Sequence, residues 1–149
     1  MSRVWGRDGN ADVTLMKILV IDDVEAERYL VRRYLSQSGL KYEMHEAEDG
    51  QSGLRMAETL NPDCILLDLK LPDKSGFEVL QDLVGQERPP KRTVIIYTVL
   101  SPNPLREKAL HLGACDFLVK GRTDAAALNR AIGQAIEKSR SNHSKTGER

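Results

Sequence analysis

The chain of 149 residues has little of several features that would point to particular classes of protein. Lys plus Arg and Asp plus Glu both total 22, so no net charge attracts the chain to nucleic acid or to a membrane surface. No stretch approaches the roughly 20 apolar residues that cross a bilayer, and residues 1–15 lack the apolar core of a signal peptide. We therefore expect a cytoplasmic protein that contacts neither nucleic acid nor membrane.

Cysteines, clustered histidines and glycine-rich loops are scarce as well. The two cysteines, Cys64 and Cys115, lie in apolar runs typical of core strands, which favours buried free thiols over a disulfide. The three histidines show no ligand spacing with acids or cysteines, so we expect no transition-metal site. Neither a G-x-G-x-x-G motif nor a Walker glycine loop occurs, so the sequence gives no support for a nucleotide site.

A chain of this length is expected to form one domain and to bury about 68–70% of its unfolded surface. Residues 1–15 are polar and contain glycines, which indicates a flexible N-terminal leader. Residues 139–149 contain no apolar residue, which indicates a polar, frayed C-terminal tail. The folded domain is therefore predicted over residues 16–138.

Strand-like and helix-like segments alternate between the leader and the tail. Strands are expected at about 17–22, 41–47, 63–68, 93–98 and 115–119, and helices at about 25–38, 54–60, 77–84, 104–112 and 124–138. Five strands alternating with five helices predict an α/β fold, a doubly wound parallel sheet with helices on both faces.

Four of the five predicted strands end in a residue that suits phosphoryl chemistry. Asp22 and Asp23 end the first strand, Asp68 the third, Thr98 the fourth and Lys120 the fifth. In an open parallel sheet, ligands bind outside the carboxyl ends of the strands. Three carboxylates there repel one another unless a cation lies between them, and hard oxygen ligands suit Mg²⁺. The pattern predicts a Mg²⁺ site at which an aspartate can act as a nucleophile toward a phosphoryl group, with the hydroxyl of Thr98 and the charge of Lys120 to bind its oxygens.

Each of these residues also has a simpler interpretation. An Asp-Asp pair after a strand often caps a helix, and Asp68 can cap the following loop. Thr98 can be an ordinary strand residue, and Lys120 a solvated charge. We favour the functional interpretation because all five positions fall on the same edge of the predicted sheet.

Four segments resemble the receiver domain of two-component response regulators, and the resemblance covers roughly residues 16–138. The segments are ILVIDD at 18–23, the D-x-x-x-P-x-x-x-G run at 68–76, VIIYT at 94–98 and DFLVK at 116–120. The resemblance implies a flavodoxin-like, five-stranded sheet in the order 2-1-3-4-5. It also implies that Asp68 accepts a phosphoryl group from a histidine kinase or a histidine phosphotransfer protein.

The resemblance further implies how Mg²⁺ is held. Asp23 and Asp68 would bind the ion directly, and Asp22 would help through water. The backbone carbonyl of Lys70 would be a further ligand.

Thr98 and Phe117 match the hydroxyl and aromatic switch positions of the family, and Lys120 matches the lysine that binds the phosphoryl group. The implied switch acts on the face formed by the fourth helix, the fifth strand and the fifth helix. This face includes Pro104, Arg106, Glu107, Lys108, Arg122, Arg130 and Glu137. Its partner is a downstream protein or a second copy in a homodimer, although a plain solvated face is almost as plausible. Phe117 can also be an ordinary core residue.

Three departures from the family pattern lie close to the predicted site. Gly121 stands where the family usually has a cis-proline, and a cis bond before another residue costs about 2.5–4 kcal/mol, so we predict a trans bond. Val99 stands where a small residue is common, so we expect slower access for small donors and water. Lys70 and Leu100 occupy the variable positions that tune hydrolysis. Because leucine cannot position a water, we expect a long-lived phosphoryl group.

The leading interpretation is a phosphoryl-accepting signalling module, which catalyses only its own phosphorylation and dephosphorylation. It is either a stand-alone regulator or the front part of a longer sensor or effector protein. One alternative is a Mg²⁺-dependent phosphatase of the haloacid dehalogenase type, but Lys70 stands where that family needs a second aspartate. A receiver-like interaction module that is never phosphorylated is disfavoured, because the acids, Thr98 and Lys120 are all present.

Overall fold

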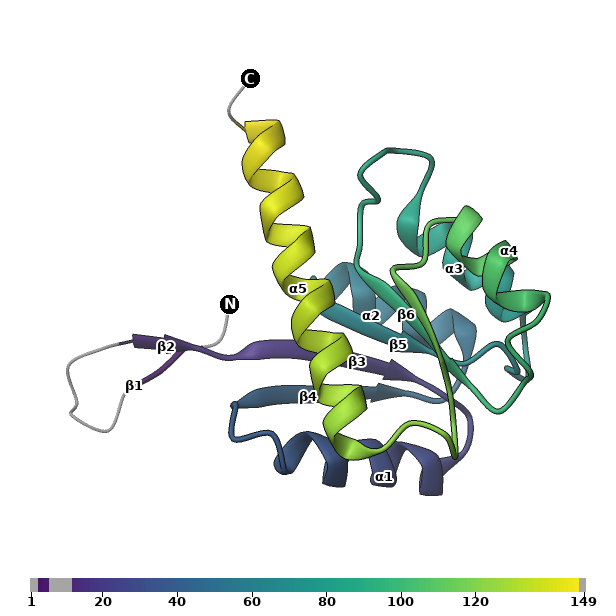
Figure 1. The fold of residues 1–149 in the computed structure, drawn as a ribbon, viewed down its shortest axis with the longest axis horizontal. Helices are drawn as coiled ribbons and strands as arrows, with labels where there is room; N and C mark the ends of the chain where they lie inside the picture. Colours follow the sequence, from purple (N-terminus) through teal and green to yellow (C-terminus); the bar gives the residue numbers. More distant parts are fainter. Residues whose placement is uncertain (1–2, 6–11, 148–149) are drawn as a thin grey trace.

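From residue 16 onward, strands and helices alternate along the chain (Figure 1). The computed structural model describes the backbone of residues 3–5 and 12–147 and the side chains of residues 15–142. The strands are β1 (Arg3–Trp5), β2 (Asp12–Thr14), β3 (Met16–Ile21), β4 (Tyr42–Ala47), β5 (Cys64–Leu67), β6 (Val94–Thr98) and β7 (Asp116–Val119). The helices are α1 (Glu25–Ser36), α2 (Gly50–Leu60), α3 (Gly76–Val84), α4 (Leu105–His111) and α5 (Ala125–Gly147).

A five-stranded sheet in the order β4-β3-β5-β6-β7 forms the centre of the molecule. All neighbouring strands in this sheet run parallel. Counted within the sheet alone, the order is 2-1-3-4-5, so the predicted fold class and strand order are confirmed. The strand predicted at about 41–47 is β4, which forms one edge of the sheet, and β7 forms the other edge.

Both faces of the sheet are covered by helices. Along β3, Ile18 and Val20 pack with α1 and α5, whereas Leu19 and Ile21 pack with α2, α3 and α4. This two-sided burial explains why the central strands are almost continuously apolar. Every residue of β5 and β6 is buried, so their polar neighbours are confined to the strand ends.

Helix α5 is longer than predicted, since it runs for 23 residues to Gly147 instead of ending near residue 138. Its C-terminal part projects beyond the sheet (Figure 1), and the predicted tail from residue 139 is therefore helical over most of its length. The buried residues Leu128, Ile132 and Ile136 hold the first part of the helix against the sheet. No glycine or proline follows until Gly147, so the helix that they nucleate continues into polar sequence.

The N-terminal segment contains paired strands where the sequence predicted a flexible leader at 1–15. Strands β1 and β2 pair antiparallel, with Val4 opposite Val13, in a sheet separate from the central one. The rest of the leader up to residue 11 lies outside the described residues.

The two cysteines, both free thiols, differ in burial. Cys64 is fully buried in β5, as predicted, but Cys115 is exposed, so the prediction of a core position was wrong there. Strand β7 begins one residue later, and Cys115 lies in the turn from α4, where its N–H donates to the carbonyl of Val94 at 2.7 Å. The helices within the described residues include none whose length and hydropathy would let it cross a membrane.

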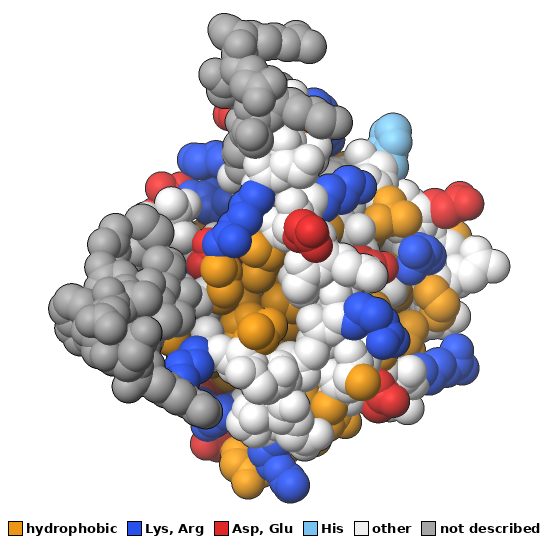
Figure 2. Space-filling model, turned by 60° about the vertical axis from the view of Figure 1, so that its left-hand side comes forward, with side chains coloured by type: hydrophobic (Ala, Val, Ile, Leu, Met, Phe, Trp, Pro, Cys, Tyr) orange, Lys and Arg blue, Asp and Glu red, His pale blue; other side chains and the backbone are white. Residues whose placement is uncertain are grey.

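An apolar cavity lies away from the carboxyl ends of the strands. Figure 2 shows a face of the molecule on which hydrophobic side chains gather in a hollow bordered by charged ones. A cavity of about 410 Å³ is lined mainly by side chains of α1, β4 and the turn between them. It contains none of the predicted site residues.

Candidate functional site

Three carboxylates meet at the C-terminal edge of the sheet. Asp22 and Asp23 follow β3, and Asp68 follows the neighbouring strand β5. One ligand oxygen from each acid lies within 4.8 Å of the other two. Asp22 and Asp68 are only 2% and 5% exposed, whereas Asp23 is exposed. This spacing and this set of oxygen donors fit a hard divalent cation such as Mg²⁺.

Lys120, at the end of β7, is buried beside these acids. Its Nζ donates to Asp68 Oδ2 at 3.1 Å and also to Asp22 Oδ2. Burial alone would lower the pKa of Lys120, but its hydrogen bonds to Asp22 and Asp68 and the charges of these acids outweigh burial and raise the pKa. The lysine is therefore charged at neutral pH and offsets part of the negative charge around it.

Hydrogen bonds to the protein backbone fix the orientation of two of the acids. Asp22 Oδ1 accepts from the N–H of Val24 at 3.0 Å, and Asp68 Oδ1 accepts from the N–H of Lys70 at 3.2 Å. Arg28 of α1 donates from Nη1 to the carbonyl of Asp22 at 2.7 Å. Because one oxygen of each acid bonds to the backbone, the other turns toward Lys120.

The loop after β5 is held in place at two points. Asp73 accepts from the N–H groups of Gly50 and Gln51 at 2.8 and 2.9 Å, and these bonds lower the pKa of Asp73. At the start of α3, Gly76 packs so closely that a Cβ there would lie 2.4 Å from the Cα of Leu69. Sequence reasoning missed the role of Asp73, because its partners are 23 and 22 residues away.

A pocket of about 380 Å³ opens at this edge. It is lined by Asp23, Val24, Glu27, Asp68, Lys70, Leu71, Pro72, Val99 and Lys120. Val99 is 56% exposed at the pocket, where the sequence predicted it, whereas Leu100 packs against the core. Sequence reasoning missed Glu27, whose Oε2 lies 3.9 Å from Lys120 Nζ. Its position in the first turn of the helix after Asp23 was the available signal.

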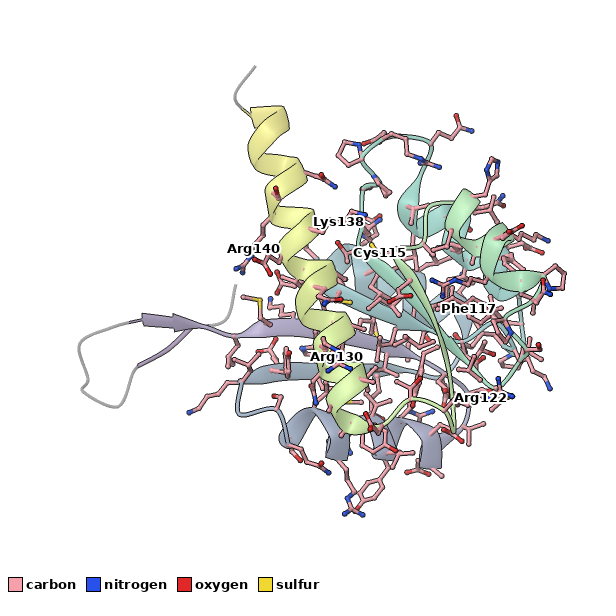
Figure 3. The ribbon with its side chains drawn as sticks, in the orientation of Figure 1. Cys115, Phe117, Arg122, Arg130, Lys138 and Arg140 are labelled. Atoms are coloured by element: carbon pink, nitrogen blue, oxygen red, sulfur yellow. The ribbon has the colours of Figure 1, made fainter. Side chains whose placement is uncertain are left out.

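The two residues predicted to form a switch are both buried. Thr98 is fully buried, does not line the pocket, and accepts from the N–H of Leu100 at 3.4 Å. Phe117, labelled in Figure 3, is 3% exposed and belongs to the core cluster that includes α2, α3 and α4. Arg106 of α4 donates to the carbonyl of Phe117 at 3.1 Å, which links the backbone of β7 to α4.

The peptide bond between Lys120 and Gly121 is trans, as predicted, and Gly121 has a φ of +85°. Proline cannot adopt this conformation, because its ring holds φ near −65°. The loop after β7 therefore depends on a glycine where a proline is usual among receiver domains.

Replacing Gly121 by alanine should lower the free energy of unfolding by about 1–2 kcal/mol, the usual cost of a left-handed backbone for a residue with a Cβ. A Cβ at this position would touch nothing within 4 Å, so backbone strain is the only cause. Urea denaturation measures the change, and Gly121→Asn should lose less, because asparagine tolerates this conformation. Equal stability of the alanine variant and the unmodified protein would contradict the prediction.

Comparison with known proteins agrees with this geometry. A family model described as the response regulator receiver domain matches residues 18–132. The chain belongs to this family and is a receiver domain, a signalling module of two-component systems.

Relatives and solved structures extend the comparison. The transcriptional regulatory protein SrrA of Staphylococcus aureus (strain NCTC 8325 / PS 47) is 35% identical over 104 residues, which cover 70% of this chain and 41% of SrrA. The chain thus spans less than half the length of the curated relatives it matches. The signal receiver domain of a putative Luxo repressor protein from Vibrio parahaemolyticus has a TM-score of 0.76 at 27% identity, covering 85% of this chain and 94% of that one. The Mn²⁺-bound form of response regulator Rcp1 has a TM-score of 0.66 at 27% identity, and the match covers 79% of this chain and 90% of Rcp1.

Proposed function

We propose that this receiver domain accepts a phosphoryl group on Asp68 from a histidine kinase or a histidine phosphotransfer protein. The observation that carries the proposal is the buried contact of Lys120 with Asp68, inside a cluster of three carboxylates at the sheet edge. An Oδ atom of Asp68 attacks the phosphorus, the P–N bond to the donor histidine breaks, and its electron pair stays on the imidazole. Lys120 then balances charge on the phosphoryl oxygens, which Thr98 approaches with its hydroxyl.

We propose Mg²⁺ as the cation of this site, bound by Asp23, Asp68 and the carbonyl of Lys70, with Asp22 acting through water. When bound, Mg²⁺ neutralises phosphoryl oxygens and aligns the donor for in-line attack. Both oxygens of Asp22 already accept from Val24 and Lys120, which supports an indirect role for this acid. The Mn²⁺-bound form of the similar protein Rcp1 also supports a divalent cation.

Intact-protein mass spectrometry tests the proposal. The chain is incubated with Mg²⁺ and either phosphoramidate or a phosphohistidine-bearing transfer protein, and Asp68→Asn is treated in parallel. The matched control is Asp82→Asn, which removes an exposed carboxylate on α3. Hydroxylamine should remove the added group, because it cleaves acyl phosphates and leaves phosphoserine intact.

The expected result is a gain of one phosphoryl group by the unmodified protein and by Asp82→Asn, but none by Asp68→Asn. An equal gain in Asp68→Asn would contradict Asp68 as the acceptor. No gain even from the phosphohistidine donor would contradict the proposed function as a whole.

We infer that phosphorylation acts on partners through the face formed by α4, β7 and α5. Its seven predicted residues are all exposed, and two of them, Arg122 and Arg130, are labelled in Figure 3. Arg106 joins α4 to β7, since it bonds to the carbonyl of Phe117 and lies 3.6 Å from Asp116. A change at Phe117 would therefore act directly on α4. A downstream protein or a second copy of this chain would recognise the changed face.

The phosphatase alternative has no specific observation in its favour. Lys70, which stands where that chemistry needs a second aspartate, is exposed at the pocket and supplies no carboxylate. The alternative of a receiver that is never phosphorylated is disfavoured by the close approach of Lys120 to Asp68.

A phosphoryl group on Asp68 should persist for minutes or longer, because Leu100 cannot hold an attacking water. Replacing Leu100 by glutamine should shorten this lifetime about tenfold, somewhat less than the 10²–10⁴ supplied by a well-placed general base. Leu112→Gln is the control, because Leu112 packs against the same core as Leu100. Loss of the mass increment with time gives the rates. Decay of the unmodified phosphoprotein within seconds, or equal acceleration in both variants, would contradict this prediction.

A further inference from the structure

Glu27 is a further carboxylate of the phosphorylation pocket, to which the sequence pattern assigns no role. It belongs to the first turn of α1 and lines the pocket together with Asp23 and Asp68. Its Oε2 lies 3.9 Å from Lys120 Nζ, and its side chain is 32% exposed, against 5% for Lys120. Glu27 therefore stands at the mouth of the pocket, whereas Lys120 lies on the floor.

The charge of the pocket depends on Glu27. Lys120 faces three carboxylates, Asp22, Asp68 and Glu27. Three carboxylates, those of Asp23, Glu27 and Asp68, line the pocket, and the buried Asp22 contacts Lys120. The two lysines that line the pocket, Lys70 and Lys120, offset half of these four negative charges. Once a divalent cation is bound, its two positive charges and those of the two lysines balance the four carboxylates. Without Glu27 the loaded pocket would carry a net positive charge and would attract an anionic donor more strongly.

We propose that Glu27 selects the phosphoryl donor by charge, by repelling small anionic acyl phosphates from the pocket. Transfer from a phosphohistidine is less affected, because contacts between the two proteins position that donor. With acetyl phosphate, an Oδ atom of Asp68 bonds to phosphorus, the P–O bond to the acetyl group breaks, and acetate leaves with the electron pair. The inference rests on the proposed phosphorylation of Asp68.

Charge repulsion by Glu27 can be distinguished from steric hindrance by Val99. Val99 also lines the pocket, but an apolar side chain restricts every small donor alike, whatever its charge or the salt concentration. Repulsion by Glu27 grows with the charge of the donor and weakens as ionic strength rises. A rate that depends on donor charge and on ionic strength therefore identifies an electrostatic role of Glu27, which a merely structural residue would not have.

Glu25 provides a matched control for Glu27. Both acids lie in the first turn of α1 and interact with the same helix N-terminus, so replacing either removes the same charge from the same helix end. Glu25 is exposed and does not line the pocket. A difference between Glu27→Gln and Glu25→Gln therefore reports on the pocket and not on helix stability.

The experiment measures phosphorylation rates of both variants with acetyl phosphate, a dianion at neutral pH, and with phosphoramidate, a monoanion. Mg²⁺ is kept saturating, at a concentration set by calorimetric titration of each variant. At low salt, Glu27→Gln should react with acetyl phosphate about three- to tenfold faster than the unmodified protein. The gain in rate should be smaller with phosphoramidate, and it should disappear at high salt. Its Mg²⁺ affinity should fall severalfold, while Glu25→Gln should match the unmodified protein in both assays.

Equal rates in Glu27→Gln and the unmodified protein would overturn the proposal. A gain that is independent of donor charge and of salt would overturn it too, because steric relief would then explain the result. Absence of phosphorylation in all three proteins would instead contradict the function proposed for Asp68. In that case the Mg²⁺ titration still tests the role of Glu27. An unchanged Mg²⁺ affinity of Glu27→Gln would show that the charge of Glu27 does not act on the pocket.

Discussion

Replacing Gly76 by alanine should lower the free energy of unfolding by about 2–4 kcal/mol, as severe overpacking does. The new Cβ would lie 2.4 Å from the Cα of Leu69 and 2.7 Å from the carbonyl oxygen of Asp68. Both neighbours are backbone atoms, which cannot turn aside as the end of a flexible side chain would. The chain after β5 would have to shift, and with it Asp68, the proposed nucleophile. Phosphorylation should therefore slow by about tenfold to a hundredfold, since a displacement of about 1 Å can cost that much.

A second glycine makes this prediction specific to position 76. Gly133 lies within α5, and a Cβ there would meet nothing within 4 Å. Gly133→Ala should stabilise the protein by up to about 1 kcal/mol, because alanine is the better helix former. Urea denaturation and the rate of mass gain with phosphoramidate measure both variants. If Gly76→Ala kept full stability and an unchanged rate, the close packing of α3 on the loop would be unimportant.

Replacing Lys120 by methionine should lower the free energy of unfolding in the absence of divalent cations by about 3–5 kcal/mol. This is the usual cost of removing one partner of a buried ion pair. Asp22 and Asp68 would remain buried and adjacent without the lysine ammonium group that both now contact. Saturating Mg²⁺ should restore much of the loss, and the rise in Tm on adding Mg²⁺ should be larger than in the unmodified protein. Thermal unfolding with and without Mg²⁺ measures both effects.

The pH dependence of this loss follows from the raised pKa of Lys120 in the folded protein. A raised pKa contributes stability that is complete below the ordinary lysine value of about 10.4 and disappears as the pH rises through the folded value. The difference in free energy of unfolding between Lys120→Met and the unmodified protein should therefore stay constant around neutral pH and narrow only in strongly alkaline solution. Lys91→Met is the control, because Lys91 pairs at 3.7 Å with an exposed glutamate and should contribute less than about 1 kcal/mol. Equal losses in both variants would contradict the assigned role of Lys120.

The central sheet and the cluster at its edge followed from the sequence because buried parallel strands leave few choices. An apolar run must end where the chain leaves the core, and the residue at that end must lie on the edge shared by all the strands. Asp22, Asp68 and Lys120 were therefore predictable as neighbours before any contact was known. The trans bond before Gly121 was predictable for a local reason, namely the cost of a cis bond without proline.

The features that sequence reasoning missed depend on distances between segments or on precise strand limits. Cys115 was assigned to the core because its strand was expected to begin one residue too early. The end of α5 was misplaced because polar composition does not stop a helix that packing has already nucleated. Asp73 acts through partners on another element, so no local pattern revealed it. Glu27 contacts Lys120 from another element as well, and its position shortly after Asp23 was the only local signal.

The contact of Lys120 with Asp22 joins residues 98 positions apart in the sequence. Asp22 follows β3, the first strand of the central sheet along the chain, and Lys120 follows β7, the last. The other three strands of the sheet lie between them in the sequence. Contacts of such long range form late in folding, because closing a long loop costs more entropy than closing a short one. During synthesis the acidic residues therefore emerge well before the lysine that compensates them. Completion of the sheet and completion of the cluster at its edge are one event, so a chain that stalls before β7 has the three acids but lacks the lysine that contacts two of them.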